Sequence, residues 1–111
     1  MPPLSAPNPA VAELAAVLGE GQAREVVRTF LKSFPSLLHE LTLGDRERGR
    51  RAAHSLKSSA RQMGALALSQ RMADIEERLG RPDGVVAVTD LAHIARDFSA
   101  AAGPLRAFAG A

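Results

Sequence analysis

The sequence predicts an all-α fold, an up-down antiparallel four-helix bundle with a short additional N-terminal helix. Apolar residues recur at spacings of three and four along several long segments, and no segment shows the alternation of a β-strand. The connections between these segments are short, which favours antiparallel neighbours. Of the 111 residues 46% are hydrophobic, and the aromatic residues are four Phe. This composition suits a single compact helical domain, which we expect over residues 8–108.

The N-terminal elements are expected to be a flexible tail and a short helix. Residues 1–7 are rich in proline and lack helical periodicity, as is typical of a flexible tail. Asn8 can cap a helix, and Pro9 suits the first helical position, where no backbone N–H is needed. A short helix is therefore predicted from here to Gly19. Its apolar edge consists of Val11, Leu14 and Leu18.

A long amphipathic helix is predicted over residues 21–43. Its apolar stripe has helical spacing and consists of Val27, Phe30, Phe34, Leu37, Leu38 and Leu41. Pro35 lies within this segment and removes one backbone hydrogen bond, but the stripe continues in phase on both sides. We therefore expect a kink at Pro35 rather than a break.

Three more segments complete the predicted bundle. Gly44 and Asp45 supply a helix stop and an N-cap, so a helix is predicted from there to about Met63, halted by Gly64. The next helix is predicted over residues 65–79, with a stripe of Leu68, Met72, Ile75 and Leu79.

The last helix is predicted over residues 84–102, after a turn at residues 80–83 in which Asp83 supplies the N-cap. It is expected to stop at Gly103-Pro104. Its predicted buried residues are Val88, Leu91, Ile94 and Phe98. The tail beyond is expected to pack through Leu105 and Phe108.

The composition excludes several classes of protein. Without cysteine the chain has neither disulfides nor thiolate chemistry. It lacks an apolar run long enough to span a membrane and the pattern of a secretory signal, so we expect a cytoplasmic protein without membrane contact. The net charge is only +2, yet residues 45–62 hold six cations against two anions. This basic segment could receive an acidic partner, a phosphoryl group or nucleic acid.

His54 lies within this basic segment, on the polar side of the predicted helix. On a helical wheel with Leu56 at zero, the buried stripe falls within about 60° of Leu56. That stripe consists of Ala52, Ala53, Leu56, Ala60 and Met63. His54 falls at about 160°, with Lys57 at about 100° and Arg61 at about 140°. The imidazole is therefore expected to face solvent beside two cations.

The run His54-Ser-Leu-Lys-Ser-Ser59 resembles the motif of histidine-containing phosphotransfer (HPt) domains of two-component phosphorelays. That motif is approximately H-x-L-K-G-S with a later glycine, whose position Gly64 occupies. The segments Phe34-Pro35-x-Leu37-Leu38 and Ile75-Glu76 also resemble the family. Family members are four-helix bundles with the active histidine exposed midway along one helix. Ser58 departs from the motif, because the family usually has glycine there.

The resemblance implies that His54 is the phospho-acceptor. Its neutral imidazole would take a phosphoryl group from a receiver-domain phosphoaspartate and pass it to another receiver aspartate. Lys57 is implied to neutralise the negative charge on the oxygens of the transferring phosphoryl group. Arg50 and Arg61 are implied to add to its positive electrostatic field. Glu76, on the neighbouring helix, is implied to orient the ring. Of the remaining motif residues, Ser58 keeps the site small, and Gly64 ends the helix and lets the next one pack closely.

The implied partners are response-regulator receiver domains and a hybrid histidine kinase. The sequence contains no Gly-rich nucleotide loop, and His39 and His93 lack a ligand-like spacing to His54. We therefore expect no cofactor and no metal on this chain, and Mg²⁺ and ATP on the partner proteins. The chain would be a carrier without kinase activity of its own, and we expect a monomer.

Two other functions are compatible with the sequence. A four-helix adaptor would dock on receiver domains or kinases without being phosphorylated, and would tolerate loss of His54. A nucleic-acid binder would use the basic helix, which the sequence pI of about 9.9 permits. Against nucleic acid, no aromatic residues are interleaved with the cations, helix-turn-helix spacing is missing, and acidic residues accompany the arginines.

Overall fold

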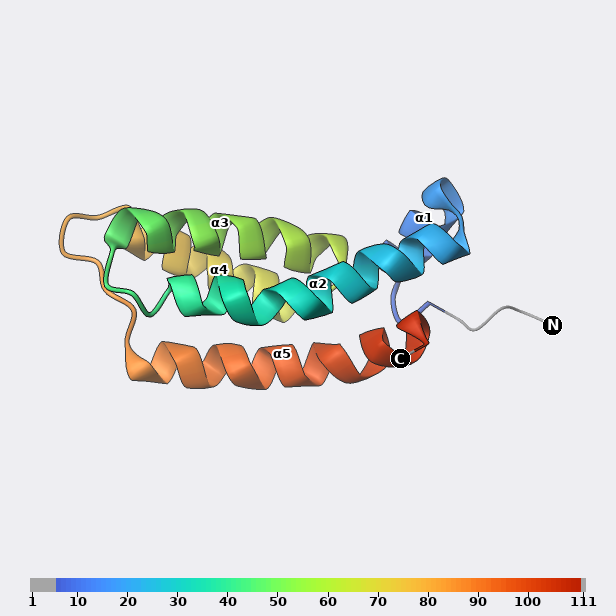
Figure 1. Ribbon diagram of the computed structural model, residues 1–111. Coiled ribbons are helices and arrows are strands. Elements are labelled where there is room, and N and C mark those ends of the chain that lie inside the picture. Colours follow the sequence, from blue (N-terminus) through green and yellow to red (C-terminus); the bar gives the residue numbers. More distant parts are fainter. Residues whose placement is uncertain (1–5, 111) are drawn as a thin grey trace.

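The computed structural model describes residues 6–110, whose regular structure is entirely helical (Figure 1). The helices are α1 (Pro9–Leu18), α2 (Glu20–Glu40), α3 (Arg46–Gln62), α4 (Leu66–Leu79) and α5 (Val88–Ala109). Helices α2 to α5 run alternately in opposite directions, and α1 lies at the end of the bundle where α2 begins and α5 ends. The predicted all-α bundle with an additional N-terminal helix is confirmed.

Asn8 fixes α1 to the rest of the bundle. Its Oδ1 accepts a hydrogen bond from the Val11 N–H at 2.9 Å, as a helix cap should, and its Nδ2 donates to the Met63 carbonyl at 2.8 Å. Leu18 is 45% exposed, so its predicted place on the apolar edge is wrong. Leu18 is exposed because it is the last residue of α1. Of the predicted tail, residues 1–5 lie outside the described residues.

Removing the Asn8 side chain should lower the free energy of unfolding by about 1–2 kcal/mol, because both a helix cap and a link to the α3–α4 connection are lost. Urea unfolding followed by circular dichroism measures this change for Asn8→Ala. Asn8→Asp is the matched variant, since it retains the capping oxygen but has no N–H for Met63. It should lie between wild type and Asn8→Ala, and an unchanged midpoint in Asn8→Ala would contradict this account.

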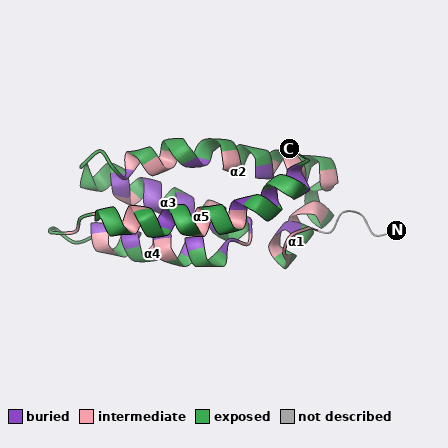
Figure 2. Ribbon diagram, turned by 90° about the horizontal axis from the view of Figure 1, so that it is seen from below, coloured by how far each residue is buried: buried purple, intermediate pink, exposed green. Residues whose placement is uncertain are grey.

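The core lies between the four long helices, where Figure 2 shows the buried residues on the inward faces. Helix α2 passes through Pro35 without a break, as predicted, and ends at Glu40 rather than at residue 43. The Phe34 and Phe98 rings stack with their centroids 3.9 Å apart, which joins α2 to α5. The largest fully buried side chains are Val11, Val27, Leu56, Met63, Leu68, Met72, Ile75, Ile94 and Leu105.

The start of α5 differs from the prediction. Asp83 is not the N-cap, and α5 begins at Val88 rather than at residue 84. Asp90 accepts a hydrogen bond from the Ala87 N–H at 2.7 Å and forms an ion pair with Arg78 at 2.5 Å, so the carboxylate that caps α5 lies inside its first turn. Val88, predicted as buried, is 82% exposed because it lies at the solvent side of this turn.

The end of α5 also differs, because the helix continues through Gly103 and Pro104 to Ala109. Proline costs one backbone hydrogen bond there, on an exposed side of the helix. Continuing the helix buries Leu105 and Phe108, which confirms that both residues pack on the bundle. Arg24 and Arg28 of α2 also donate to the carbonyls of the last turn, those of Phe108 and Ala109. Burial and these contacts outweigh the Gly-Pro stop signal.

None of the helices in residues 6–110 combines the length and the apolar character that crossing a membrane requires.

Candidate functional site

Helix α3 presents His54 to solvent. Asp45 caps the helix by accepting a hydrogen bond from the Arg48 N–H at 3.1 Å. Gly64 ends it with φ +74°, which allows the Ala65 N–H to reach the Ala60 carbonyl at 2.9 Å. The small and apolar face of α3 packs inward, and the His54 side chain on the other face is 61% exposed. The predicted exposure of His54 is confirmed.

Glu76 of α4 connects His54 and Lys57 through the two oxygens of one carboxylate. Its Oε2 lies 2.8 Å from His54 Nδ1, and its Oε1 lies 2.7 Å from Lys57 Nζ. The Glu76 side chain is only 20% exposed, so the carboxylate lies between α4 and the outward face of α3. The structure thus brings together His54, Lys57 and Glu76, three of the residues predicted for the site.

This contact fixes which nitrogen of the neutral imidazole is available. An ionised carboxylate only accepts hydrogen bonds, so Nδ1 must carry the hydrogen that points at Glu76. The lone pair of the neutral ring is then on Nε2. Within residues 6–110 no hydrogen-bond partner contacts Nε2. His54 therefore offers solvent a nitrogen that can act as a nucleophile.

Lys57 lowers the pKa of the Glu76 carboxyl below its ordinary value of 4.5, chiefly through their hydrogen bond. Partial burial opposes this shift, and the hydrogen bond from His54 adds to the lowering. Because the pKa is lowered, Glu76 is ionised at neutral pH and remains so into the mildly acidic range. The carboxylate can then hold the ring and the ammonium group together.

The lowered pKa of Glu76 predicts a pH dependence of stability. Its contribution is fully present above the pKa of the unfolded chain and is lost as the pH falls through the lower pKa of the folded protein. The free energy of unfolding should therefore fall less steeply below pH 4.5 in Glu76→Gln than in the wild type. Urea unfolding at a series of pH values measures both slopes, and equal slopes would show that the carboxylate is not stabilised by its partners.

Ser69 sets the position of α4 against α3 at the level of the site. It is buried, and its hydroxyl donates to the Lys57 carbonyl at 2.9 Å. The backbone of Lys57 is thereby held on α4, the helix that also carries Glu76. Ser69 was not among the site residues predicted from the sequence. A small polar residue next to Leu68 and one turn before Met72, inside the apolar stripe of α4, is the signal that could have found it.

Within residues 6–110 the other predicted site residues form no side-chain hydrogen bond or ion pair with His54, Lys57 or Glu76. Arg50 forms an ion pair with Glu47 at 2.8 Å, which lowers the pKa of that carboxyl. Arg61 is exposed and lies about 10 Å from His54 along the helix axis. Ser58 is exposed and leaves the face around His54 open. Gly64 is structural, since a Cβ there would collide with the side chain of Asn8.

A shallow hollow of about 450 Å³ opens beside the imidazole. Its lining residues are Arg50, Arg51, His54, Ser55 and Glu76. Residues 6–110 contain no group of three or more histidine and acidic residues that could hold a metal ion. The groups around the hollow are one accessible imidazole, a carboxylate and two arginines, and the Lys57 ammonium group lies beside the same carboxylate.

The Hpt domain family matches residues 25–104, which is more than half of the chain. This match spans most of α2, all of α3 and α4, and α5 as far as Pro104, and it includes His54, Lys57 and Glu76. No curated protein and no solved structure matches the chain.

Proposed function

Because the chain belongs to the Hpt domain family and so has a phosphotransfer-related role in two-component signalling, we propose that it is a phosphoryl carrier. His54 accepts the phosphoryl group from a receiver-domain phosphoaspartate and passes it to another receiver aspartate. The observation that supports this proposal best is the exposed imidazole whose Nδ1 is held by Glu76 at 2.8 Å, which leaves Nε2 free.

In the proposed step, the Nε2 lone pair attacks the phosphorus of the acyl phosphate. An N–P bond forms, the P–O bond to the aspartyl group breaks, and the aspartate leaves as a carboxylate. The Nδ1 hydrogen stays in place, so the phosphorylated ring is a cation next to the Glu76 carboxylate. That carboxylate stabilises the cation. Transfer to the second receiver is the reverse reaction, and no proton has to leave the ring in either direction.

Lys57 acts on the phosphoryl group rather than on the imidazole ring. Its ammonium group lies 2.7 Å from Glu76 Oε1 and is only partly exposed, so its position beside the imidazole is fixed. A positive charge in that position attracts the phosphoryl oxygens as they approach Nε2. In the proposed site Glu76 orients the ring and Lys57 supports the phosphoryl group, while Gly64 and Ser69 maintain the positions of α3 and α4.

The proposed partners are receiver domains and a histidine kinase that supplies them. We propose that the carrier is monomeric and binds neither nucleotide nor metal, with Mg²⁺ held by the receiver. The reaction of this chain then needs only a nucleophilic nitrogen and a charged surface for the partner.

A transfer assay with a panel of receiver domains tests the proposal. Each receiver is phosphorylated with ³²P, freed of donor and mixed with the chain and Mg²⁺. We expect label to move from at least one receiver to this chain in an acid-labile, alkali-stable form, and then to a second, unlabelled receiver. If a receiver binds the chain but all of its label stays on aspartate or is released as phosphate, the chain is an adaptor rather than a carrier.

A further inference from the structure

Three of the six cations in residues 45–62 are neutralised by carboxylates. Each of the three carboxylates near this face already has a cation. The pairs are Arg48–Glu40 at 2.7 Å, Arg50–Glu47 at 2.8 Å and Lys57–Glu76 at 2.7 Å. An incoming phosphoryl group therefore meets little net charge from these residues.

Arg51 is different. Within residues 6–110 it takes part in no ion pair or side-chain hydrogen bond, and it is exposed. It lines the hollow that His54 and Glu76 also line, and it lines the neighbouring hollow together with Glu40 and Ser55. Arg51 thus brings an uncompensated positive charge to the edge of the site.

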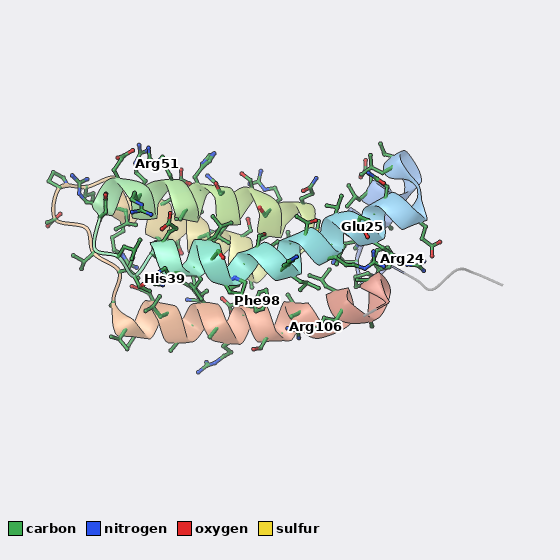
Figure 3. All side chains as sticks on the ribbon, viewed as in Figure 1. Arg24, Glu25, His39, Arg51, Phe98 and Arg106 are labelled. Atoms are coloured by element: carbon green, nitrogen blue, oxygen red, sulfur yellow. The ribbon has the colours of Figure 1, made fainter. Side chains whose placement is uncertain are left out.

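Helix geometry places Arg51 within reach of a group on His54. The two residues are three apart, so they are neighbours on the helix surface with Cβ atoms about 5–6 Å apart. Lys57 lies one turn beyond His54, toward Glu76 and α4, whereas Arg51 lies one turn before it. A phosphoryl group on Nε2 would therefore have a cation on each side. Figure 3 shows Arg51 on the outer side of α3, and Arg106 on α5 at the opposite side of the bundle.

We propose that Arg51 binds the phosphoryl group carried by His54, with its guanidinium contacting the phosphoryl oxygens. This inference rests on the proposed phosphorylation of His54. A guanidinium presents two parallel N–H donors that match two phosphoryl oxygens, whereas the Lys57 ammonium is a point charge that Glu76 already shares. Arg50, which the sequence suggested for this role, is held by Glu47 instead.

Chemical phosphorylation tests the contact without a receiver. His39→Gln and His93→Gln leave His54 as the single histidine of an untagged protein, and phosphoramidate is the donor. In this background we compare the protein that retains both arginines with Arg51→Ala and with Arg106→Ala. Arg106→Ala removes the same charge far from the site. The readouts are the rate of phosphohistidine formation and the pH midpoint of the ³¹P resonance. Circular dichroism checks that each variant is folded.

Arg51→Ala should slow phosphohistidine formation about three- to tenfold and move the ³¹P midpoint to higher pH, because an arginine contact favours the doubly charged phosphoryl group. Arg106→Ala should change neither readout. If Arg51→Ala behaves like Arg106→Ala, the inference is overturned even where phosphohistidine forms. If Arg51→Ala shifts the midpoint while no receiver transfers label to the chain, the contact stands and the proposed relay function fails.

Discussion

His54→Gln is expected to abolish transfer of the phosphoryl group from receivers to this chain. Glutamine has about the length of histidine and can still hydrogen-bond with Glu76, but its amide nitrogen has no nucleophilic lone pair. The side chain at this position is 61% exposed, so the free energy of unfolding should change by no more than about 0.5 kcal/mol. A complete loss of transfer would therefore reflect chemistry and not unfolding.

The transfer assay with ³²P-labelled receiver measures this loss directly. His39→Gln is the matched control, since His39 is an exposed histidine on α2, a different helix of the bundle (Figure 3). It should accept label at the wild-type rate. Equal labelling of His54→Gln and wild type would show that another residue accepts the phosphoryl group.

Glu76→Ala is expected to lower the maximal rate of transfer about tenfold, less than the ~10⁴-fold loss when the carboxylate partner of a buried catalytic histidine is replaced, because His54 is exposed to water. Two consequences of the change oppose each other. The imidazole loses the acceptor that keeps the hydrogen on Nδ1, which slows the chemical step. Lys57 loses its carboxylate, and the additional free positive charge strengthens attraction of an anionic partner.

The kinetics separate these two consequences. We expect a lower maximal rate, with half-saturation at the same or a lower receiver concentration. Glu76→Gln should retain more activity, because its amide oxygen can still accept from Nδ1. Glu77→Ala is the control, since Glu77 is the exposed neighbour and pairs with Arg81 instead. An unchanged maximal rate in Glu76→Ala would remove Glu76 from the mechanism.

The bundle was largely predictable because caps and apolar stripes within each helical segment indicate the helices. Asn8 and Asp45 cap the helices that they were predicted to cap, and the apolar stripe of α4 is buried as expected. The limits of α5 were not predictable in the same way. Its first turn is capped by Asp90 from within the helix, and its last turn continues past Gly103-Pro104 because burial of Phe108 depends on tertiary packing.

In the site, too, features that depend on one helix could be predicted, whereas contacts between helices could not be predicted from local patterns. Exposure of His54 followed from the helical wheel, because it depends on α3 alone. The Glu76 contact links two helices, so only the family resemblance suggested it. The pairing of Arg50 with Glu47 is within one helix, at a spacing of three, and could have been found from the sequence. The hydrogen bond from Ser69 to Lys57 depends on how α4 packs against α3, which no local pattern specifies.

The nitrogen that carries the phosphoryl group is the most direct test of this mechanism. In ¹⁵N-histidine-labelled protein phosphorylated by a receiver, ¹⁵N and ³¹P resonances identify the nitrogen bonded to phosphorus. The 2.8 Å contact between Nδ1 and Glu76 predicts phosphorus on Nε2 of His54 and hydrogen on Nδ1. Phosphorus on Nδ1, or on a residue other than His54, would contradict the role assigned here to the Glu76 carboxylate.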